Sequence, residues 1–199
     1  MIISLIGFMG CGKSSVGRRL SQLLCCRFID LDEAVEEVVG KRLPEIFASE
    51  GEAAFRRLET QILKDILSAE HERQCAPCEV GGGKEIPMTI SAVLALGGGT
   101  VMTPECADMV RENTCCIYLR ASVNTLLERL SSNTSNRPLL TRDPHAALQG
   151  AQRRGNPSLH SRIDELMLQR SSTYEKTANI IIDTDGKSIE QICSEIVRP

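Results

Sequence analysis

The residues most suited to chemistry lie near the start of the chain, where glycine, lysine and serine recur at fixed distances. Gly7, Gly12, Lys13 and Ser14 match the phosphate-binding pattern G-x-x-x-x-G-K-[ST] at every fixed position. Glycines let the backbone curl so that successive N–H groups point at an anion. The lysine can then reach the β- and γ-phosphates of a nucleotide, and the serine hydroxyl can bind Mg²⁺. The motif predicts a nucleotide site formed by Gly10, Cys11, Gly12, Lys13, Ser14 and Ser15.

Two carboxylates, Asp30 and Asp32, end the second apolar run of the chain. Alternation along a strand would direct both side chains to one side, toward the phosphate loop. A carboxylate there can hold Mg²⁺ through water, and a second can accept a proton from a substrate hydroxyl. The structural alternative is that Asp32 caps the next helix. Because that cap would leave Asp30 without a role, the functional interpretation is favoured.

Two further features could contact a substrate. Gly97, Gly98 and Gly99 follow the third apolar run, where they would let the backbone lie against a ligand; a flexible turn is the simpler alternative. Arg56 and Glu59 are three residues apart and would share one face of a helix. They could form a solvated ion pair, or Glu59 could hold a guanidinium that binds a substrate carboxylate. Periodicity alone does not choose between the two.

These residues need a scaffold that brings the ends of several strands together. Apolar runs predict five strands, and the segments between them have helical periodicity. The expected strands are 2–6, 27–31, 89–96, 115–119 and 179–183, and the expected helices are 14–24, 33–39, 43–50, 53–67, 104–113, 123–130, 162–177 and 188–197. This alternation predicts one α/β domain over 1–199, with a parallel sheet covered on both faces and ligands beyond the carboxyl ends of its strands.

Two segments interrupt the alternation. Residues 69–88 contain the run Gly81-Gly82-Gly83-Lys84 and two prolines, and they are predicted to form a surface-loop insertion. Residues 131–161 are rich in Ser, Asn, Arg, Gly and Pro and carry four arginines. Such a segment suits a lid that closes on phosphate groups, although a solvated loop would have the same composition.

Composition argues against several classes of protein. The 23 basic and 26 acidic residues give a net charge of -3, and the chain has no Trp, two Tyr and four Phe. Nucleic-acid binders usually have a basic excess and aromatic side chains that stack on bases, so no nucleic-acid partner is expected. No apolar run is long enough to cross a membrane, and the short N-terminal run lacks the basic flank of a signal peptide. We therefore expect a cytoplasmic protein with no membrane partner.

Nine cysteines are present, and reduced thiols are expected in such a protein. The pairs Cys25-Cys26 and Cys115-Cys116 lie in apolar surroundings, where cysteine packs as a small buried hydrophobe. Cys75 and Cys78 have the spacing of a metal or redox pair. Further ligands at suitable spacing are missing apart from a nearby histidine, so neither function is favoured.

Taken together, the motifs resemble those of the shikimate kinases, and the resemblance covers nearly the whole chain. In the family's order they read G-F-M-G-C-G-K-S-S-V-G-R-R-L, F-I-D-L-D, G-E-A-A-F-R-R-L-E, L-G-G-G-T-V, N-R-P-L-L and a final arginine before S-S-T-Y. The resemblance implies a three-layer P-loop kinase fold with a five-stranded parallel sheet, a shikimate-binding helical segment over 32–61 and a mobile lid. It also implies ATP-dependent phosphorylation of the shikimate 3-hydroxyl, a step toward chorismate and the aromatic amino acids.

The resemblance implies roles at the phosphate end of the site. Lys13 and Arg137, the latter from the lid, would stabilise charge on the transferring phosphoryl group. Ser14 would bind Mg²⁺, and Asp30 would hold the same ion through water. Asp32 would bind the ring hydroxyls of shikimate and is the candidate base.

The resemblance also implies contacts around the two ligands. Arg56 and Arg170 would grip the substrate carboxylate, with Arg162 as the competitor of Arg170. Gly97–Gly99 would line the same pocket, and Arg129 would lie against adenine. The expected partners are thus ATP or ADP and shikimate, and a monomer is expected.

Two other functions stay open. A related small-molecule kinase would act on another hydroxylated acid, and Arg56 indicates that such an acceptor is anionic. A catalytically inactive nucleotide-binding homologue would be expected to have lost Lys13, Asp32, Arg56 or Arg137. All four are present.

Overall fold

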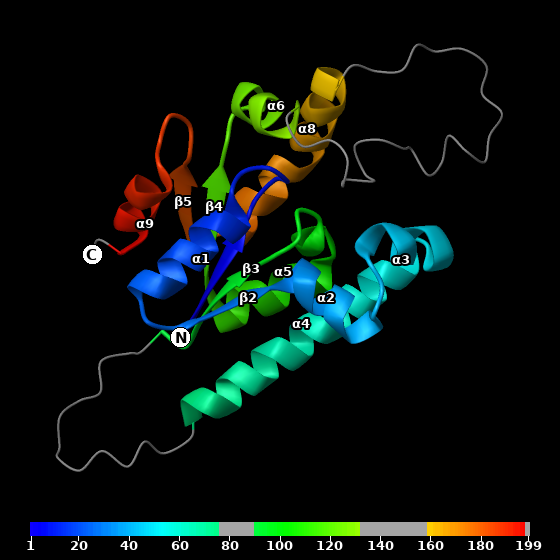
Figure 1. Ribbon diagram of the computed structural model, residues 1–199, viewed down its shortest axis with the longest axis vertical. Coiled ribbons are helices and arrows are strands. Elements are labelled where there is room, and N and C mark those ends of the chain that lie inside the picture. The colour runs from blue at the N-terminus through cyan, green and yellow to red at the C-terminus, as the bar shows by residue number, and fades with distance from the viewer. Residues whose placement is uncertain (76–89, 132–158, 198–199) are drawn as a thin grey trace.

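The computed structural model describes residues 1–75, 90–131 and 159–197, in which a parallel sheet is flanked by helices (Figure 1). Its strands are β1 (Ile2–Ile6), β2 (Arg27–Asp30), β3 (Ala92–Ala95), β4 (Thr114–Arg120) and β5 (Ile180–Asp183). They lie in the order β2-β3-β1-β4-β5, and every pairing is parallel. The five-stranded parallel sheet predicted from the sequence is confirmed.

The position of β1 at the centre of the sheet accounts for its apolar sequence. All five of its residues are buried, as expected for a strand with neighbours on both edges and helices on both faces. Ile3 pairs with Val93 of β3 and with Cys115 of β4. Because parallel strands end at one edge of the sheet, β1, β2 and β3 deliver the residues that follow them to the same place.

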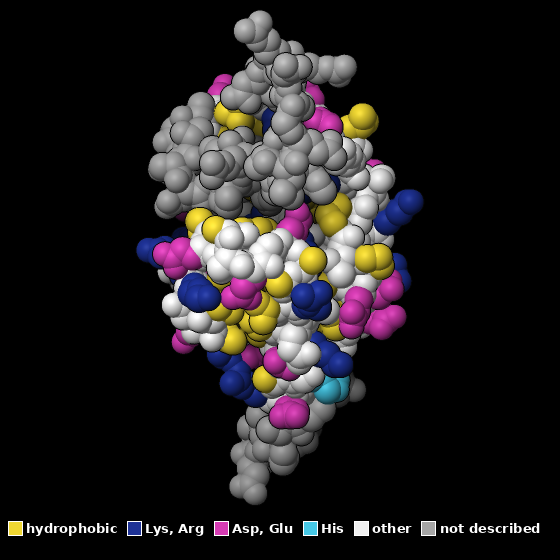
Figure 2. All heavy atoms as spheres, turned by 90° about the vertical axis from the view of Figure 1, so that its right-hand side faces the viewer, with side chains coloured by type: hydrophobic (Ala, Val, Ile, Leu, Met, Phe, Trp, Pro, Cys, Tyr) yellow, Lys and Arg dark blue, Asp and Glu magenta, His cyan; other side chains and the backbone are white. Residues whose placement is uncertain are grey.

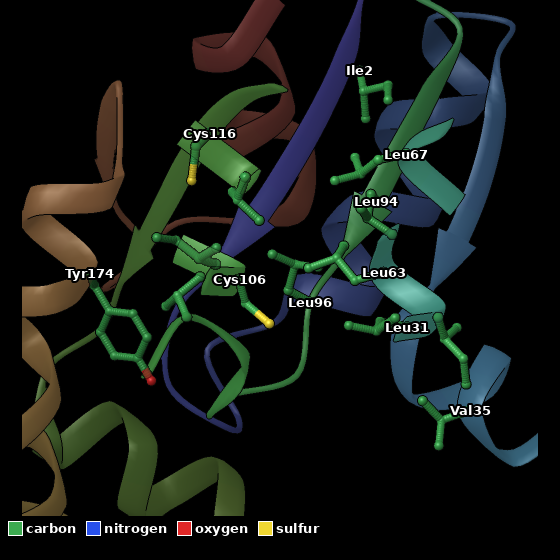
Figure 3. Packing of buried hydrophobic residues seen from close by; sticks show 14 of the residues in the cluster. Ile2, Leu31, Val35, Leu63, Leu67, Leu94, Leu96, Cys106, Cys116 and Tyr174 are labelled. Carbon is green, nitrogen blue, oxygen red and sulfur yellow. The ribbon is translucent and has the colours of Figure 1, made fainter. Parts of the chain in front are cut away.

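Two hydrophobic clusters, one on each face of the sheet, hold the helices in position. Alternate residues of β1 supply both, since Ile3 and Leu5 belong to one cluster and Ile2 and Ile6 to the other. The first cluster contains residues of α1 (Lys13–Leu23), α6 (Val123–Ser131) and α9 (Ile189–Val197). The second, part of which Figure 3 shows, contains residues of α2 (Leu31–Val39), α3 (Leu43–Glu50), α4 (Glu52–Cys75) and α5 (Pro104–Asn113).

The last long helix, α8 (Leu159–Thr177), contributes to both clusters. Its Ile163 packs in the first cluster and its Tyr174 in the second. A short 3-10 helix that the sequence did not predict, η1 (Thr100–Met102), follows the glycine triplet and contacts α8. The triplet therefore lies between the sheet and α8.

The two irregular segments are partly helical, which corrects the sequence prediction. Residues 69–75 continue α4 to Cys75 instead of beginning a loop, and the remainder of the expected insertion lies outside the described residues. Ion pairs support this extension, because Glu70 contacts Arg73 one turn later and Arg27 of β2. Of the expected lid, Ser131 ends α6 and 159–161 begin α8, while 132–158 lie outside the described residues.

Cysteine burial agrees only partly with expectation. The seven cysteines whose side chains are described are free thiols, and Cys116 is buried as predicted. Cys25 is exposed instead, because it lies in the turn after α1 with a φ of 50°.

The surface of the described chain is mixed in charge. Basic and acidic side chains are interspersed on the face shown in Figure 2. Among the described helices, none combines the length and apolar character needed to cross a membrane.

Candidate active site

A cavity of about 830 Å³ opens beyond the carboxyl ends of β1, β2 and β3. This volume lies within the range of small-molecule sites. Most of the residues predicted to be functional line it: Gly10, Cys11, Gly12, Lys13, Ser14, Ser15, Asp30, Asp32, Arg56, Gly97, Gly98, Gly99 and Arg129. Arg170 is not among the lining residues but contacts Gly98, which is, and Arg137 lies outside the described residues.

The loop between β1 and α1 curls through backbone angles that favour glycine. Gly7, Gly10 and Gly12 have φ values of 140°, 83° and 103°. A Cβ atom on Gly7 would lie 2.6 Å from the carbonyl oxygen of Leu119, so this position admits no side chain. The loop is therefore shaped by its own glycines and by the end of β4.

Lys13 begins α1, and its side chain is buried inside the loop. Its Nζ donates to the carbonyl oxygens of Gly7 and Phe8 at 3.0 and 3.1 Å. Hydrogen bonds from an ammonium to an anion are roughly twice as strong as those between neutral groups. Lys13 is thus a positive charge at the centre of a loop whose geometry suits a phosphate.

Arg129 of α6 reaches the same loop from outside. Its Nη1 donates to the carbonyl oxygen of Cys11 at 3.1 Å. The cavity also includes Lys187, Ile189 and Ile192, which follow β5. Sequence reasoning missed these three residues because they belong to no motif and lie near the loop only once α9 packs beside α1.

Ser14 and Asp30 come from neighbouring elements and form a hydrogen bond. The hydroxyl of Ser14 donates to Oδ2 of Asp30 at 2.6 Å. Oδ1 of Asp30 accepts the N–H of Asp32 at 3.1 Å and caps α2. The sequence alternative therefore named the wrong cap: β2 ends at Asp30 and α2 begins at Leu31, so Asp32 already lies within the helix and does not alternate with Asp30 along a strand. Hydroxyl and carboxylate oxygens are ligands that suit Mg²⁺.

Asp32, which does not cap the helix, lines the cavity. Burial raises the pKa of its carboxyl group to about 6, and the carboxylates of Asp30 and Glu59 add to the rise. The positive charges of Lys13 and Arg56 oppose it. A carboxyl group with a pKa close to the working pH can both accept and release a proton, so Asp32 is suited to general base catalysis.

The first glycine of the triplet lies among polar side chains. A Cβ atom on Gly97 would lie 2.9 Å from Oδ1 of Asp32, Oε1 of Glu59 and Oγ1 of Thr100. These three side chains come from α2, α4 and η1. They can converge at this point because Gly97 has no side chain.

The other two glycines pack against the phosphate loop and against Arg56. A Cβ atom on Gly98 would lie 3.2 Å from the backbone nitrogen of Met9 in the phosphate loop. One on Gly99 would collide with the guanidinium of Arg56. Close packing against three different neighbours, rather than a need for flexibility, explains the triplet.

The guanidinium of Arg56 is held by a buried carboxylate. Its Nη1 donates to Oε2 of Glu59 at 2.6 Å, and the side chain of Glu59 is only 1% exposed. The other oxygen of Glu59 accepts the hydroxyl of Thr100 at 2.6 Å. Because Glu59 is shielded from water, this is not a solvated ion pair. Glu59 thus fixes the guanidinium of Arg56 in the cavity wall, and the binding of a substrate carboxylate by Arg56 stays a prediction.

Arg170 approaches the triplet from α8. Its Nη1 lies 3.4 Å from the carbonyl oxygen of Gly98, and its guanidinium lies 5.9 Å from the centre of the Phe8 ring. This contact supports Arg170 over Arg162, which lies two turns earlier on the helix. The hydroxyl of Tyr174, one turn after Arg170, donates to the same carbonyl oxygen.

The cavity wall also includes residues that no motif signalled. Leu43 and Phe47 of α3 line it together with Phe55 of α4, and Glu36 and Arg42 lie beside them. The rings of Phe47 and Phe55 are 4.5 Å apart between centroids. All five belong to the segment 32–61, whose predicted role was assigned to the segment as a whole. Their apolar and charged types alone do not distinguish them from ordinary amphipathic helix residues.

Comparison with known proteins agrees with this site. A sequence model of the family described as shikimate kinase matches residues 9–83 and 84–199. The shikimate kinase of Marinomonas sp. (strain MWYL1) is 35% identical over 196 residues, which cover 98% of this chain and 89% of the relative. That of Bordetella pertussis (strain Tohama I) is 37% identical over 196 residues, covering 98% and 76%.

Solved structures give the same result. The shikimate kinase from Acinetobacter baumannii in complex with shikimate has a TM-score of 0.76 and 27% identity, covering 98% of this chain and 90% of that one. The shikimate kinase from Aquifex aeolicus has a TM-score of 0.69 and 29% identity, covering 99% and 94%. Because the family match spans almost the whole sequence and full-length relatives exceed 30% identity, this chain belongs to the shikimate kinase family, the ATP-dependent kinases that act on shikimate.

Proposed function

We propose that the cavity holds ATP along the phosphate loop and shikimate against the glycine triplet, and that the γ-phosphate passes to the 3-hydroxyl of shikimate. The observation that carries this proposal is the packing of Gly98 on Met9, because it puts the acceptor wall (Asp32, Arg56, Gly97–Gly99 and Arg170) against the phosphate loop. Phosphoryl transfer depends mainly on aligning the two reactants and on surrounding the transferring group with positive charge. The products are shikimate 3-phosphate and ADP.

On the nucleotide side, the backbone of residues 10–15 binds the phosphates, and Lys13 stabilises the charge that develops during transfer. Arg129 lies near the adenine, and Arg137 is proposed to assist Lys13. The oxygen donors of Ser14 and Asp30 fit Mg²⁺, with Ser14 as direct ligand and Asp30 acting through water. When bound, this ion neutralises phosphate charge.

On the acceptor side, Arg56 and Arg170 bind the planar carboxylate of shikimate, and Gly97–Gly99 let the ring approach the backbone. Asp32 accepts the proton of the 3-hydroxyl while the oxygen of that hydroxyl bonds to the γ-phosphorus. The bond from phosphorus to the leaving oxygen breaks, and ADP keeps that electron pair. A pKa of about 6 leaves Asp32 mostly ionised at neutral pH, as a base must be.

At the level of the whole chain, we propose a single domain in which 32–61 binds shikimate. The lid role expected for 131–161 stays a prediction, and so does the part of the insertion expected over 69–88 that follows Cys75. We further propose that the protein works as a cytoplasmic monomer with no nucleic-acid partner.

The test is ADP release from purified protein with Mg-ATP, measured with shikimate, quinate or gluconate. Strong stimulation by shikimate is expected, with little from quinate or gluconate. Stronger stimulation by another acid would favour the related-kinase alternative, and ATP binding without turnover on any acceptor would favour an inactive homologue. Asp32→Asn protein is the matched control, because it should bind both ligands and turn over slowly.

A further inference from the structure

Tyr174 connects the hydrophobic core to the acceptor wall, and none of the roles above uses it. Its side chain is fully buried, and its ring lies 5.1 Å from that of Tyr118 between centroids. Figure 3 shows it projecting from α8 among the buried side chains of the second cluster. Its hydroxyl leaves this apolar setting and donates to the carbonyl oxygen of Gly98.

That carbonyl differs from its neighbours in how it is held. The carbonyl oxygen of Gly97 accepts the N–H of Thr100 at 3.2 Å, and that of Gly99 accepts the N–H of Met102 at 3.0 Å. Both are local bonds of the η1 turn. The carbonyl of Gly98 is bound by two side chains of α8, Tyr174 and Arg170.

The two contacts on Gly98 differ in strength. At 3.4 Å the contact from Nη1 of Arg170 is long for a hydrogen bond and therefore weak. Burial raises the pKa of Tyr174, so its hydroxyl keeps its proton at physiological pH and remains a donor. Tyrosine has two side-chain torsions and its ring is packed, whereas arginine is long and adaptable.

We propose that Tyr174 is a positioning residue for Arg170: its hydroxyl holds the Gly98 carbonyl, so that the guanidinium can leave that carbonyl and bind the substrate carboxylate. The physical reason is the cost of an unpaired buried acceptor. With the tyrosine in place, Arg170 moves without leaving the carbonyl unpaired. Without the hydroxyl, Arg170 would have to break the remaining contact before binding substrate. The inference rests on the proposed role of Arg170.

The same bond orients the backbone of the triplet. The described chain contains no cis peptide, and in a trans peptide the N–H points opposite to the carbonyl. Fixing the Gly98 carbonyl toward α8 therefore also fixes the N–H of Gly99. If the peptide between Gly98 and Gly99 could rotate, the Gly99 backbone against which the Arg56 guanidinium packs would not keep a fixed position.

The test compares Tyr174→Phe with Tyr118→Phe in the full-length protein. Both changes remove one hydroxyl from the same buried ring pair, but only the first removes a contact with the site. For Tyr174→Phe we expect the KM for shikimate to rise about tenfold, with kcat and the KM for ATP within threefold of the parent. Tyr118→Phe is expected to leave all three within twofold. Thermal unfolding of each variant checks that the fold is retained.

Arg170→Ala and the double variant separate this inference from the role of Arg170 itself. We expect Arg170→Ala to raise the KM for shikimate, and Tyr174→Phe to add less than twofold in that background because the tyrosine acts through the arginine. If Tyr174→Phe alone leaves the KM for shikimate unchanged, or its effect is fully additive to that of Arg170→Ala, the inference is overturned. The proposed binding of the shikimate carboxylate by Arg170 is then unaffected. Equal losses in both tyrosine variants also overturn it, since they indicate general destabilisation. If Arg170→Ala has no effect on the KM for shikimate, the proposed role of Arg170 is overturned, and the inference about Tyr174 is overturned with it.

Discussion

The phosphate loop and the acceptor wall line one cavity but are built in different ways. The loop is a continuous run, from Gly7 to Ser14, whose shape comes mainly from three glycines with positive φ and from bonds among neighbouring residues, with the end of β4 packed against Gly7. The acceptor wall comes from α2, α4, the triplet before η1, and α8, joined by contacts between residues distant in sequence.

This difference separates local from tertiary control of geometry. A loop set mainly by its own backbone depends little on how the surrounding helices pack. A wall made of Asp32, Arg56 and Arg170 exists only when their helices are packed correctly. We therefore expect changes in the loop, and in the base Asp32, to affect the chemical step, and changes in Arg56 or Arg170 to affect mainly the binding of shikimate.

The largest effect is expected for Lys13→Met. Removing the charge at the centre of the loop should lower kcat about a thousandfold, or about 4 kcal/mol, because this charge would stabilise the transferring phosphoryl group. Steady-state ADP release measures it. Lys64→Met removes an exposed lysine of α4 and is the control, with less than twofold change expected. A large rise in the KM for shikimate with little change in kcat would contradict the division between the two regions.

The next effect is expected for Arg56→Ala, on the wall. We expect the KM for shikimate to rise about a hundredfold. The change removes a guanidinium proposed to bind the shikimate carboxylate, and it leaves buried Glu59 without its ion-pair partner. The KM for ATP should change less than threefold. Arg57→Ala, which removes the adjacent exposed arginine, is the matched control. Equal effects of the two substitutions on the KM for shikimate would contradict the proposed role of Arg56 in binding shikimate.

A smaller effect concerns pH and Asp32. Its folded pKa of about 6 exceeds the usual value of 3.8, so between these values the folded state binds more protons than the unfolded one, and stability falls as pH rises. Asp32→Asn should therefore stabilise the protein by about 1–2 kcal/mol at pH 7.5, after allowance for solvent screening, and by much less near pH 4. Urea unfolding at both pH values measures this. A gain in stability that does not depend on pH would show that the charge of buried Asp32 is not its source.

The same group sets the pH dependence of turnover. In the parent protein, kcat/KM for shikimate should fall as pH drops below about 6, because the protonated Asp32 of the free enzyme cannot accept the hydroxyl proton. The residual activity of Asp32→Asn should not show this fall. Initial rates between pH 5 and pH 8, with ATP saturating and shikimate well below its KM, measure the two profiles.

The smallest effect is expected for Gly98→Ala, where the two regions touch. The added methyl would lie 3.2 Å from the nitrogen of Met9, so the loop or the triplet must shift by a few tenths of an ångström. We expect about a tenfold loss of kcat/KM for shikimate and a loss of stability near 1 kcal/mol. Unlike the previous substitutions, it should alter both KM values. An effect confined to one substrate would show that the two regions are less tightly coupled than the packing indicates.

Most of the architecture was predictable from the sequence because its signals are local. Strands such as β1 are buried apolar runs, and helices such as α3 and α5 begin and end where the periodicity and prolines indicate. The errors lie where an element extends or begins beyond the limits that periodicity indicates. Ion pairs of Glu70 accompany the continuation of α4 to Cys75, and Asp30 caps a helix that begins two residues earlier than the periodicity suggested.

The sequence by itself determined the phosphate loop, the order of the motifs and the residue types of the acceptor wall, because glycine angles and strand-to-helix spacing are properties of short segments. Only the tertiary structure decided that Asp30 rather than Asp32 is the cap, that Glu59 is shielded from water, and that Tyr174 shares a carbonyl with Arg170. The last two facts depend on contacts between residues 41 and 76 positions apart and on burial by other helices, and the first on where β2 gives way to α2. No local pattern encodes them, since burial and partner choice emerge when the helices pack on the sheet.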